Sequence, residues 1–156
     1  MSEAANVHAT ALRLDGRGLL VRGPSGSGKS SLALSVLRRA EAAGLEAALV
    51  ADDQVLIHHE SGFLVARAPK AIAGLIEIRG VGILTERHVA ETRLHLVVDL
   101  GPRDRIERLP DPGERVEVAG LGLRRIRLPE RDPAFGADVL LTLAGSDAFW
   151  KGSPAS

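Results

Sequence analysis

The sequence lacks cysteine and tyrosine altogether and has little other aromatic content, with one tryptophan and three phenylalanines among 156 residues. The absence of cysteine excludes disulfide bonds, thiolate zinc sites and a cysteine nucleophile. The aromatic content of 3% argues against the stacking surfaces that bind single-stranded nucleic acid. No hydrophobic run approaches the roughly 20 residues that a helix needs to cross a bilayer.

An excess of charge of either sign is also missing, because 20 basic residues balance 20 acidic ones. Such a chain has no overall field that would attract it to nucleic acid or to an anionic membrane. The first residues contain no apolar stretch of the kind found in secretory signals. We therefore expect a soluble cytoplasmic protein without membrane or nucleic-acid partners. One domain is expected over residues 1–150, followed by a disordered tail over residues 151–156.

The first predicted elements follow the order of an α/β fold. Residues 19–23 and 46–53 have the apolar character of buried strands, and residues 29–43 between them have helical spacing. Gly44 is a natural stop for that helix. This order predicts a strand–helix–strand unit and at least part of a parallel sheet.

The rest of the chain is predicted to add strands and one closing helix. Strand patterns occur within residues 7–14, 54–69, 92–100 and 115–129. Residues 54–69 are expected to form a hairpin that turns at Ser61-Gly62. The closing helix is predicted over residues 132–150, with Asp132 near its cap and Pro133 in its first turn.

The stretch "GPSGSGKSS" at residues 23–31 satisfies the pattern G-x-x-x-x-G-K-[ST] in full. Glycines in such a loop let successive backbone N–H groups point at phosphate oxygens, at the positive end of the following helix. Lys29 is long enough to reach the β- and γ-phosphates, and the Ser30 hydroxyl is suited to a magnesium ion. We predict that a nucleoside triphosphate binds through Gly23, Pro24, Ser25, Gly26, Ser27, Gly28, Lys29, Ser30 and Ser31.

Two predicted strands end on acids that are suited to face the terminal phosphate. The segment "LVADD" ends on Asp52 and Asp53, and the segment "LVVDL" contains Asp99. One acid of the pair is suited to assist the metal ion and Lys29, while the other accepts the proton of an incoming hydroxyl. The alternative interpretation of the pair is a turn or a helix cap. Asp99 is interpreted as a solvated strand end.

Four segments resemble, in the same order, the catalytic C-terminal domain of bacterial HPr kinase/phosphorylase. His8 stands fifteen residues before Gly23, and the segments "GPSGSGKS", "LVADDQV" and "LIEIRGVGIL" follow. The last is the most specific, because no generic P-loop protein requires its glutamate, arginine and two glycines. The chain looks like the short form found in some proteobacteria. The resemblance implies an α/β fold with a P-loop kinase core of the HPr kinase/phosphoenolpyruvate carboxykinase type, a mixed central sheet and flanking helices.

The resemblance also implies an activity and its partners. Members of this family use ATP and Mg²⁺ to phosphorylate a serine of HPr, the phosphocarrier protein of the phosphotransferase system, and many also remove that phosphate. The family usually assembles as a hexamer. The chain is thus expected to be a protein serine kinase that acts on HPr or a similar small protein as a homo-oligomer.

Roles for single residues follow from the same resemblance. Asp53 is implied as the base toward the substrate serine, with Asp52 in support, and His8 contacts phosphate or the acid pair. Ser30 and Glu77 are implied to hold the divalent ion. Arg79 lies in the segment "EIRG" and Arg108 in the segment "IERLP". The complete catalytic set implied in this way is Asp53, Asp52, His8, Lys29, Arg108 and Arg79.

Two departures from the family pattern keep other functions open. Ser31 stands where the family usually has an acid, and Ala9 stands where glycine is common. One alternative is a small-molecule kinase with the same phosphate site. Another is a nucleotide-binding regulator with little catalysis that acts through partner contacts. The remaining four histidines lack metal-ligand spacing and are interpreted as surface or packing residues.

Overall fold

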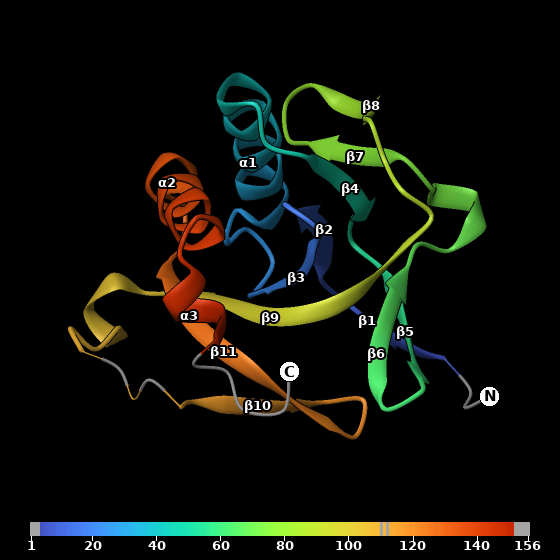
Figure 1. The fold of residues 1–156 in the computed structure, drawn as a ribbon. Helices are drawn as coiled ribbons and strands as arrows, with labels where there is room; N and C mark the ends of the chain where they lie inside the picture. The colour runs from blue at the N-terminus through green and yellow to red at the C-terminus, as the bar shows by residue number, and fades with distance from the viewer. Residues whose placement is uncertain (1–3, 110, 112, 152–156) are drawn as a thin grey trace.

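The computed structural model describes residues 4–109, 111 and 113–151. The chain has a mixed α/β fold in which few helices accompany a curled mixed sheet of nine strands and a separate two-stranded sheet (Figure 1). The strands are β1 (Ala5–Val7), β2 (Thr10–Leu14), β3 (Arg17–Arg22), β4 (Ala47–Ala51), β5 (Val55–Glu60), β6 (Phe63–Arg67), β7 (Leu75–Ile78), β8 (Gly82–Thr85), β9 (Glu91–Gly101), β10 (Arg115–Val118) and β11 (Leu121–Pro129). The helices are α1 (Lys29–Ala43), α2 (Pro133–Ala144) and α3 (Asp147–Lys151), with short 3₁₀ turns at Lys70–Ile72 and Arg103–Arg105.

The long strand β9 organises the main sheet. One edge of β9 pairs in parallel with β3. The other edge pairs first with β6, antiparallel, through Arg93, and then with β11, parallel, from Leu96 onward. Two different strands therefore share one edge of β9, and the sheet forks and curls at this point (Figure 1).

The strand–helix–strand unit predicted from the sequence differs from the observed arrangement in one respect. The strands β3 and β4 run in the same direction, but the antiparallel strand β2 lies between them. The reason is local: β2 and β3 form a hairpin that turns at Asp15-Gly16, so β2 occupies the edge of β3. The parallel part of the sheet is instead formed by β3, β9 and β11.

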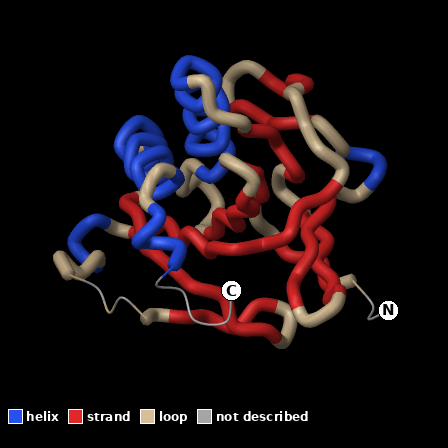
Figure 2. Tube along the Cα trace, viewed as in Figure 1, coloured by secondary structure: helices blue, strands red, loops and turns tan. Residues whose placement is uncertain are grey.

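Alternating side chains of the central strands fill two hydrophobic cores. Leu19 and Val21 point to one face of β3, against α1 and α2, while Leu20 points to the opposite face. Figure 2 shows the long helices gathered on one side of the strands. The flanking helices expected from the sequence thus cover a single face, and the strands β5, β6 and β10 contribute to the core on the other face.

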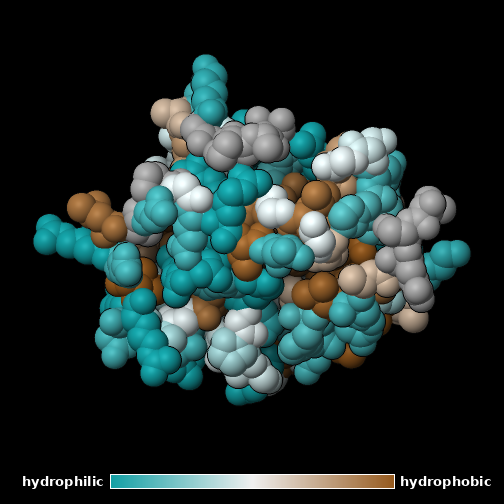
Figure 3. Space-filling view, turned by 90° about the horizontal axis from the view of Figure 1, so that it is seen from below, coloured by the Kyte–Doolittle hydropathy of each residue, from teal (hydrophilic) through white to brown (hydrophobic). Residues whose placement is uncertain are grey.

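The surface below the sheet is mostly hydrophilic. Figure 3 shows this face, on which hydrophobic residues form patches near the middle. In the hairpin β10–β11, at the bottom of Figure 1, exposed positions alternate with half-buried or buried ones along β10 and over the first residues of β11, as expected for strands with one face toward solvent. Within the described ranges, none of the helices combines the length and hydrophobicity required to cross a membrane.

The predicted closing helix is divided in two. Helix α2 begins with Asp132 as its N-cap and Pro133 in its first turn, as predicted, but it ends at Ala144. Gly145 ends α2, and the Ser146 side chain then accepts a hydrogen bond from the Phe149 N–H at the start of α3. Helix α3 continues to Lys151, while the rest of the predicted tail, residues 152–156, lies outside the described residues.

Candidate active site

The glycine-rich loop connects the end of β3 to the first residue of α1. Gly28, the N-cap of α1, has a left-handed backbone with φ of 93°, a conformation that glycine adopts without strain. Gly23 has a different constraint, since a Cβ at this position would lie 2.6 Å from the Ser27 hydroxyl oxygen. The Lys29 ammonium donates hydrogen bonds to the carbonyls of Gly23 and Pro24, at 2.9 and 3.2 Å. The loop therefore curls around its own lysine.

A backbone contact joins this loop to the start of α2. The N–H of Arg131 donates to the carbonyl of Ser27 at 2.9 Å, and Arg131 itself has φ of 53°. Asp132 then caps α2. Two segments about a hundred residues apart in sequence are thus held side by side.

Asp52 is buried at the end of β4 and accepts three hydrogen bonds from three different elements. Its Oδ1 accepts from the hydroxyls of Thr10 on β2 and Ser30 on α1, at 2.8 and 2.7 Å. Its Oδ2 accepts from the backbone N–H of Glu77 on β7 at 3.1 Å. Because a buried carboxylate needs such partners, Asp52 fixes the positions of β2, α1 and β7 relative to β4.

Asp53, the next residue, points to the open side. Its backbone is left-handed, with φ of 71°, which turns the side chain away from that of Asp52. The carboxylate Oδ1 lies 2.7 Å from Nε2 of His8, and the side chains of His8 and Asp53 are 59% and 62% exposed. The chain bends at the end of the strand, so one acid is buried while the other faces solvent.

A cavity of about 420 Å³ lies between the glycine-rich loop and the two acids. It brings together most of the site residues predicted from the sequence: His8, Ser25, Gly26, Gly28, Lys29, Ser30, Ser31, Asp52, Asp53, Glu77 and Arg79. Gly23, Pro24 and Ser27 belong to the same loop but are not among the residues that line the cavity. The carbonyls of Gly23 and Pro24 accept hydrogen bonds from Lys29, and that of Ser27 accepts one from the Arg131 N–H.

Thr10, Arg131 and Pro133 also line the cavity, and none of them was predicted from the sequence. Thr10 lies two residues after His8, a spacing that places both on one side of an extended chain, and this signal was available. Arg131 precedes the cap of α2, but nothing in the local sequence connects residues 131–133 with the glycine-rich loop.

Arg108 is not among the residues that line this cavity. It is exposed in the segment that follows β9 and lines a separate hollow of about 770 Å³, together with Arg103, Glu107 and Arg127. The predicted grouping of Arg108 with the catalytic residues is therefore not observed within one chain.

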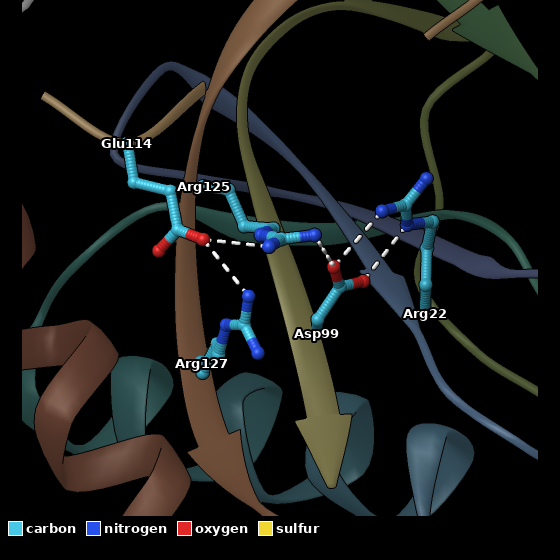
Figure 4. A network of polar contacts seen from close by, with 5 residues as sticks. All are labelled: Arg22, Asp99, Glu114, Arg125 and Arg127. Carbon is cyan, nitrogen blue, oxygen red and sulfur yellow. Dashed lines mark hydrogen bonds and ion pairs between the residues drawn. The ribbon is translucent and has the colours of Figure 1, made fainter. Parts of the chain in front are cut away.

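Asp99 belongs to an ionic network, in contrast to the solvated strand end predicted for it (Figure 4). Its two carboxylate oxygens accept from Arg22 at 2.8 and 2.9 Å, and one of them also accepts from Arg125 at 3.2 Å. Arg125 and Arg127 in turn donate to Glu114, at 2.6 and 3.0 Å. The network crosses the three parallel strands and includes the last residue of β3 before the glycine-rich loop.

Hydrogen bonds within this network shift the pKa values of two of its side chains. The hydrogen bond from Arg22 to Asp99 raises the pKa of Arg22 above its ordinary value. Hydrogen bonds from Arg125 and Arg127 lower the pKa of Glu114. Both shifts favour the charged forms of these two side chains, Arg22 and Glu114.

The donor atoms around the cavity suit a magnesium ion that arrives with phosphates. Among the described residues, no group of three or more His, Asp or Glu side chains is placed to hold a metal ion alone. The Ser30 hydroxyl and the Asp52 carboxylate are in contact, and Glu77 lines the same cavity. Mg²⁺ keeps several waters and typically takes only one or two carboxylates besides phosphate oxygens, so this donor set fits it.

Comparison with known proteins finds one matching family model and relatives of the same kind. The family model of the HPr serine kinase C-terminal domain matches residues 1–139. An HPr kinase/phosphorylase of Geobacillus sp. (strain WCH70) is 35% identical over 149 residues, in an alignment that covers 88% of this chain and 46% of that protein. An HPr kinase/phosphorylase of Bordetella pertussis is 34% identical over 139 residues, in an alignment that covers 82% of this chain and 43% of that protein. The chain thus spans about half the length of the curated relatives it matches.

A solved structure is similar over nearly the whole fold. The HPr(Ser) kinase/phosphatase from Coxiella burnetii superposes with a TM-score of 0.74 at 24% sequence identity, covering 89% of this chain and 95% of that one. At this level of identity the similarity concerns the fold alone. It agrees with the curled mixed sheet and the few helices described above.

Proposed function

The chain belongs to the family of the HPr serine kinase C-terminal domain, and from this premise we propose that it transfers the γ-phosphoryl group of ATP to a serine of HPr or a similar small protein. The main support for the proposal is the cavity in which the glycine-rich loop faces Asp52, which is buried, and Asp53, which is exposed. Asp52 contacts Ser30 of that loop, while Asp53 faces solvent beside His8. A nucleotide on one side and an acceptor hydroxyl on the other would meet at this point.

The loop and its lysine would hold the nucleotide. Backbone N–H groups at the start of α1 favour phosphate, and Lys29 would exchange the carbonyls of Gly23 and Pro24 for phosphate oxygens. Ser30, Asp52 and Glu77 are the residues that would hold Mg²⁺, as a P-loop serine and a strand-end aspartate do in related chemistry. When bound, the ion supplies neutralisation of the charge on the β- and γ-phosphates.

Asp53 would act on the acceptor. The serine oxygen attacks the γ-phosphorus, the bond from that phosphorus to the β,γ-bridging oxygen breaks, and the serine proton passes to the Asp53 carboxylate. His8 faces the same carboxylate and would hold it in position. Arg79 and Arg131 line the cavity and would stabilise charge on the transferred group. Arg108 has no role in this mechanism within one chain, because it lines a different hollow.

The names of the relatives include phosphorylase, so the reverse transfer is the second candidate activity. Inorganic phosphate would then take the position of the nucleotide's γ-phosphate and attack the phosphoserine, with Asp53 returning the proton to the serine oxygen. A hexameric assembly and a cytoplasmic location stay predictions from the resemblance and the composition.

The proposal is tested by incubating the full chain with γ-labelled ATP, Mg²⁺ and HPr, in parallel with HPr whose acceptor serine is changed to alanine. We expect label on HPr and none on the alanine form. A cell extract in place of HPr separates the alternatives. Label on a metabolite, or nucleotide binding without any transfer, would overturn the proposal.

A further inference from the structure

Thr10, the first residue of β2, is a buried polar residue in the wall of the candidate active site. Only 1% of its surface is exposed, and its hydroxyl donates to Oδ1 of Asp52 at 2.8 Å. Buried strand positions usually carry apolar residues, and valine would have nearly the same shape and the same preference for a strand. What distinguishes threonine at this position is therefore the hydrogen bond to Asp52.

An irregularity in β4 brings Asp52 to the side of the sheet that faces α1. The pairing of β2 with β4 shifts by one residue between Ala11 and Leu12, so β4 contains one extra residue at this point. As a result, both Val50 and Ala51 pack into the core on the side away from α1. Because side chains alternate along a regular strand, Asp52 would otherwise point to that same side. The extra residue thus places Asp52 beside Thr10 and the start of α1.

The lone pairs of the Asp52 carboxylate are almost fully used, since each of its oxygens can accept about two hydrogen bonds. Oδ1 accepts from the hydroxyls of Thr10 and Ser30, at 2.8 and 2.7 Å. Oδ2 accepts from the backbone N–H of Glu77 at 3.1 Å. Ser30 is the donor in its contact, so its proton points at Asp52 and the lone pairs of its oxygen are left for the cavity that it lines.

We propose that Thr10 is a positioning residue that makes Asp52 act on the divalent ion through Ser30, and that it thereby sets a preference for Mg²⁺ over Ca²⁺. The inference rests on the Mg·ATP site of the proposed function. With two hydroxyls on Oδ1, that oxygen has no lone pair left for an ion. Mg²⁺ tolerates this because it keeps several waters and needs only one or two carboxylates besides phosphate oxygens, whereas Ca²⁺ takes about six to eight oxygen ligands.

Thr10→Val removes the hydroxyl and keeps a β-branched side chain that suits the strand. Oδ1 then has a lone pair that an ion can use directly, and Ser30 is less firmly oriented. Loss of a group that orients a metal ligand typically weakens metal binding by about ten- to a hundredfold. We expect this loss for Mg²⁺ and a smaller one for Ca²⁺, because Ca²⁺ gains a ligand. A purely structural role of Thr10 would weaken binding with both ions by the same factor.

The test measures the binding of ATP to the full chain by calorimetry, once with saturating Mg²⁺ and once with saturating Ca²⁺. The quantity compared is the ratio of the two dissociation constants, which should favour Mg²⁺ in the parent chain. This preference should fall by about tenfold in Thr10→Val. Thr10→Ala removes the same hydroxyl and should shift the ratio in the same direction. Thr10→Ser keeps the hydroxyl and should stay within about twofold of the parent ratio.

Thr92→Val is the matched control for the loss of a buried hydroxyl. Thr92 is also a buried strand threonine, with 6% of its surface exposed, but it does not line the cavity. Its hydroxyl donates to the Arg93 carbonyl at 3.3 Å, so the substitution removes a comparable hydrogen bond. The control should keep the parent ratio, and circular dichroism verifies that each variant is folded.

The outcomes separate this inference from the proposed function. A parent-like ratio in Thr10→Val and Thr10→Ala, or an equal change in Thr10→Ser, would overturn the role of Thr10 and leave the proposed function standing. A parent chain that binds ATP with Mg²⁺ but does not prefer it to Ca²⁺ would do the same. A parent chain that binds ATP equally well with and without a divalent ion would overturn both, because the metal site itself would then be absent.

Discussion

Nε2 of His8 lies 2.7 Å from Oδ1 of Asp53, although 45 residues separate the two in sequence. The contact arises because β2 pairs with β4, with Ala11 opposite Ala51, so the residues just outside these strands meet. Both side chains are more than half exposed, in contrast to the buried Asp52 beside them. The pair is thus open to an incoming acceptor, while Asp52 holds the loop.

His8→Gln should separate the acceptor step from nucleotide binding. The substitution removes the imidazole that faces Asp53, so we expect kcat for phosphoryl transfer to fall by roughly ten- to a hundredfold. KM for ATP should stay within about twofold, since His8 contacts Asp53 and, among the described residues, forms no hydrogen bond or ion pair with the glycine-rich loop. Steady-state kinetics measure both constants. The exposed His88→Gln is the matched control, and an equal loss in both variants would contradict the assignment.

Asp52→Asn should weaken both the fold and Mg²⁺-dependent nucleotide binding. The amide oxygen can still accept from Thr10 and Ser30, but its NH₂ group then faces the N–H of Glu77, donor against donor. An unsatisfied buried donor costs about 1–3 kcal/mol of stability. Urea denaturation and ATP titration with and without Mg²⁺ measure the two effects.

The control for this variant is Asp138→Asn, because Asp138 is 61% exposed and forms a surface ion pair with Arg39. It should change the free energy of unfolding by less than about 1 kcal/mol. If Asp52→Asn behaves like this control in both measurements, the structural role of Asp52 is wrong.

Glu114 should make the free energy of unfolding depend on pH in the acidic range. Its pKa in the folded chain is lowered from 4.5 by hydrogen bonds from Arg125 and Arg127. As the pH falls below 4.5, the unfolded chain takes up the proton first, so the stability present at higher pH is progressively lost. Glu114→Gln should flatten this loss in denaturation curves recorded between about pH 5 and pH 3.

The comparison for this prediction is Glu107→Gln, an exposed glutamate for which the described residues provide no ion pair. It should keep the acid dependence of the parent chain. A parent-like slope in Glu114→Gln would show that the network in Figure 4 does not contribute to acid stability.

The local parts of the fold were predictable from the sequence because they depend on neighbouring residues. The buried apolar strand that became β3, the helical spacing of α1 and the hairpin at Ser61-Gly62 were all confirmed. The insertion of β2 between β3 and β4 was not predictable, because strand pairing depends on contacts between distant residues. The same limit explains Arg131, whose N–H binds Ser27 across about a hundred residues.

The other differences from the sequence predictions concern Asp99 and Arg108, whose surroundings depend on how the strands pair. Asp99 ends an apolar run as Asp52 does, yet its register opposite Arg22 places it in an ionic network. Arg108 is close in sequence to β9 but follows the chain toward β10. A pattern of residue types identifies such candidates, while the position of each depends on the sheet.

The most direct measurement is single-turnover transfer of phosphate from Mg·ATP to HPr by Asp53→Asn. Asparagine tolerates the left-handed backbone at this position, so the fold should be kept. Asp15→Asn, an exposed aspartate with φ of 51°, is the matched control. The account predicts a rate at least about a hundredfold lower for Asp53→Asn, with ATP affinity within about twofold of the parent and a parent-like rate for the control. Transfer by Asp53→Asn at the parent rate would contradict it.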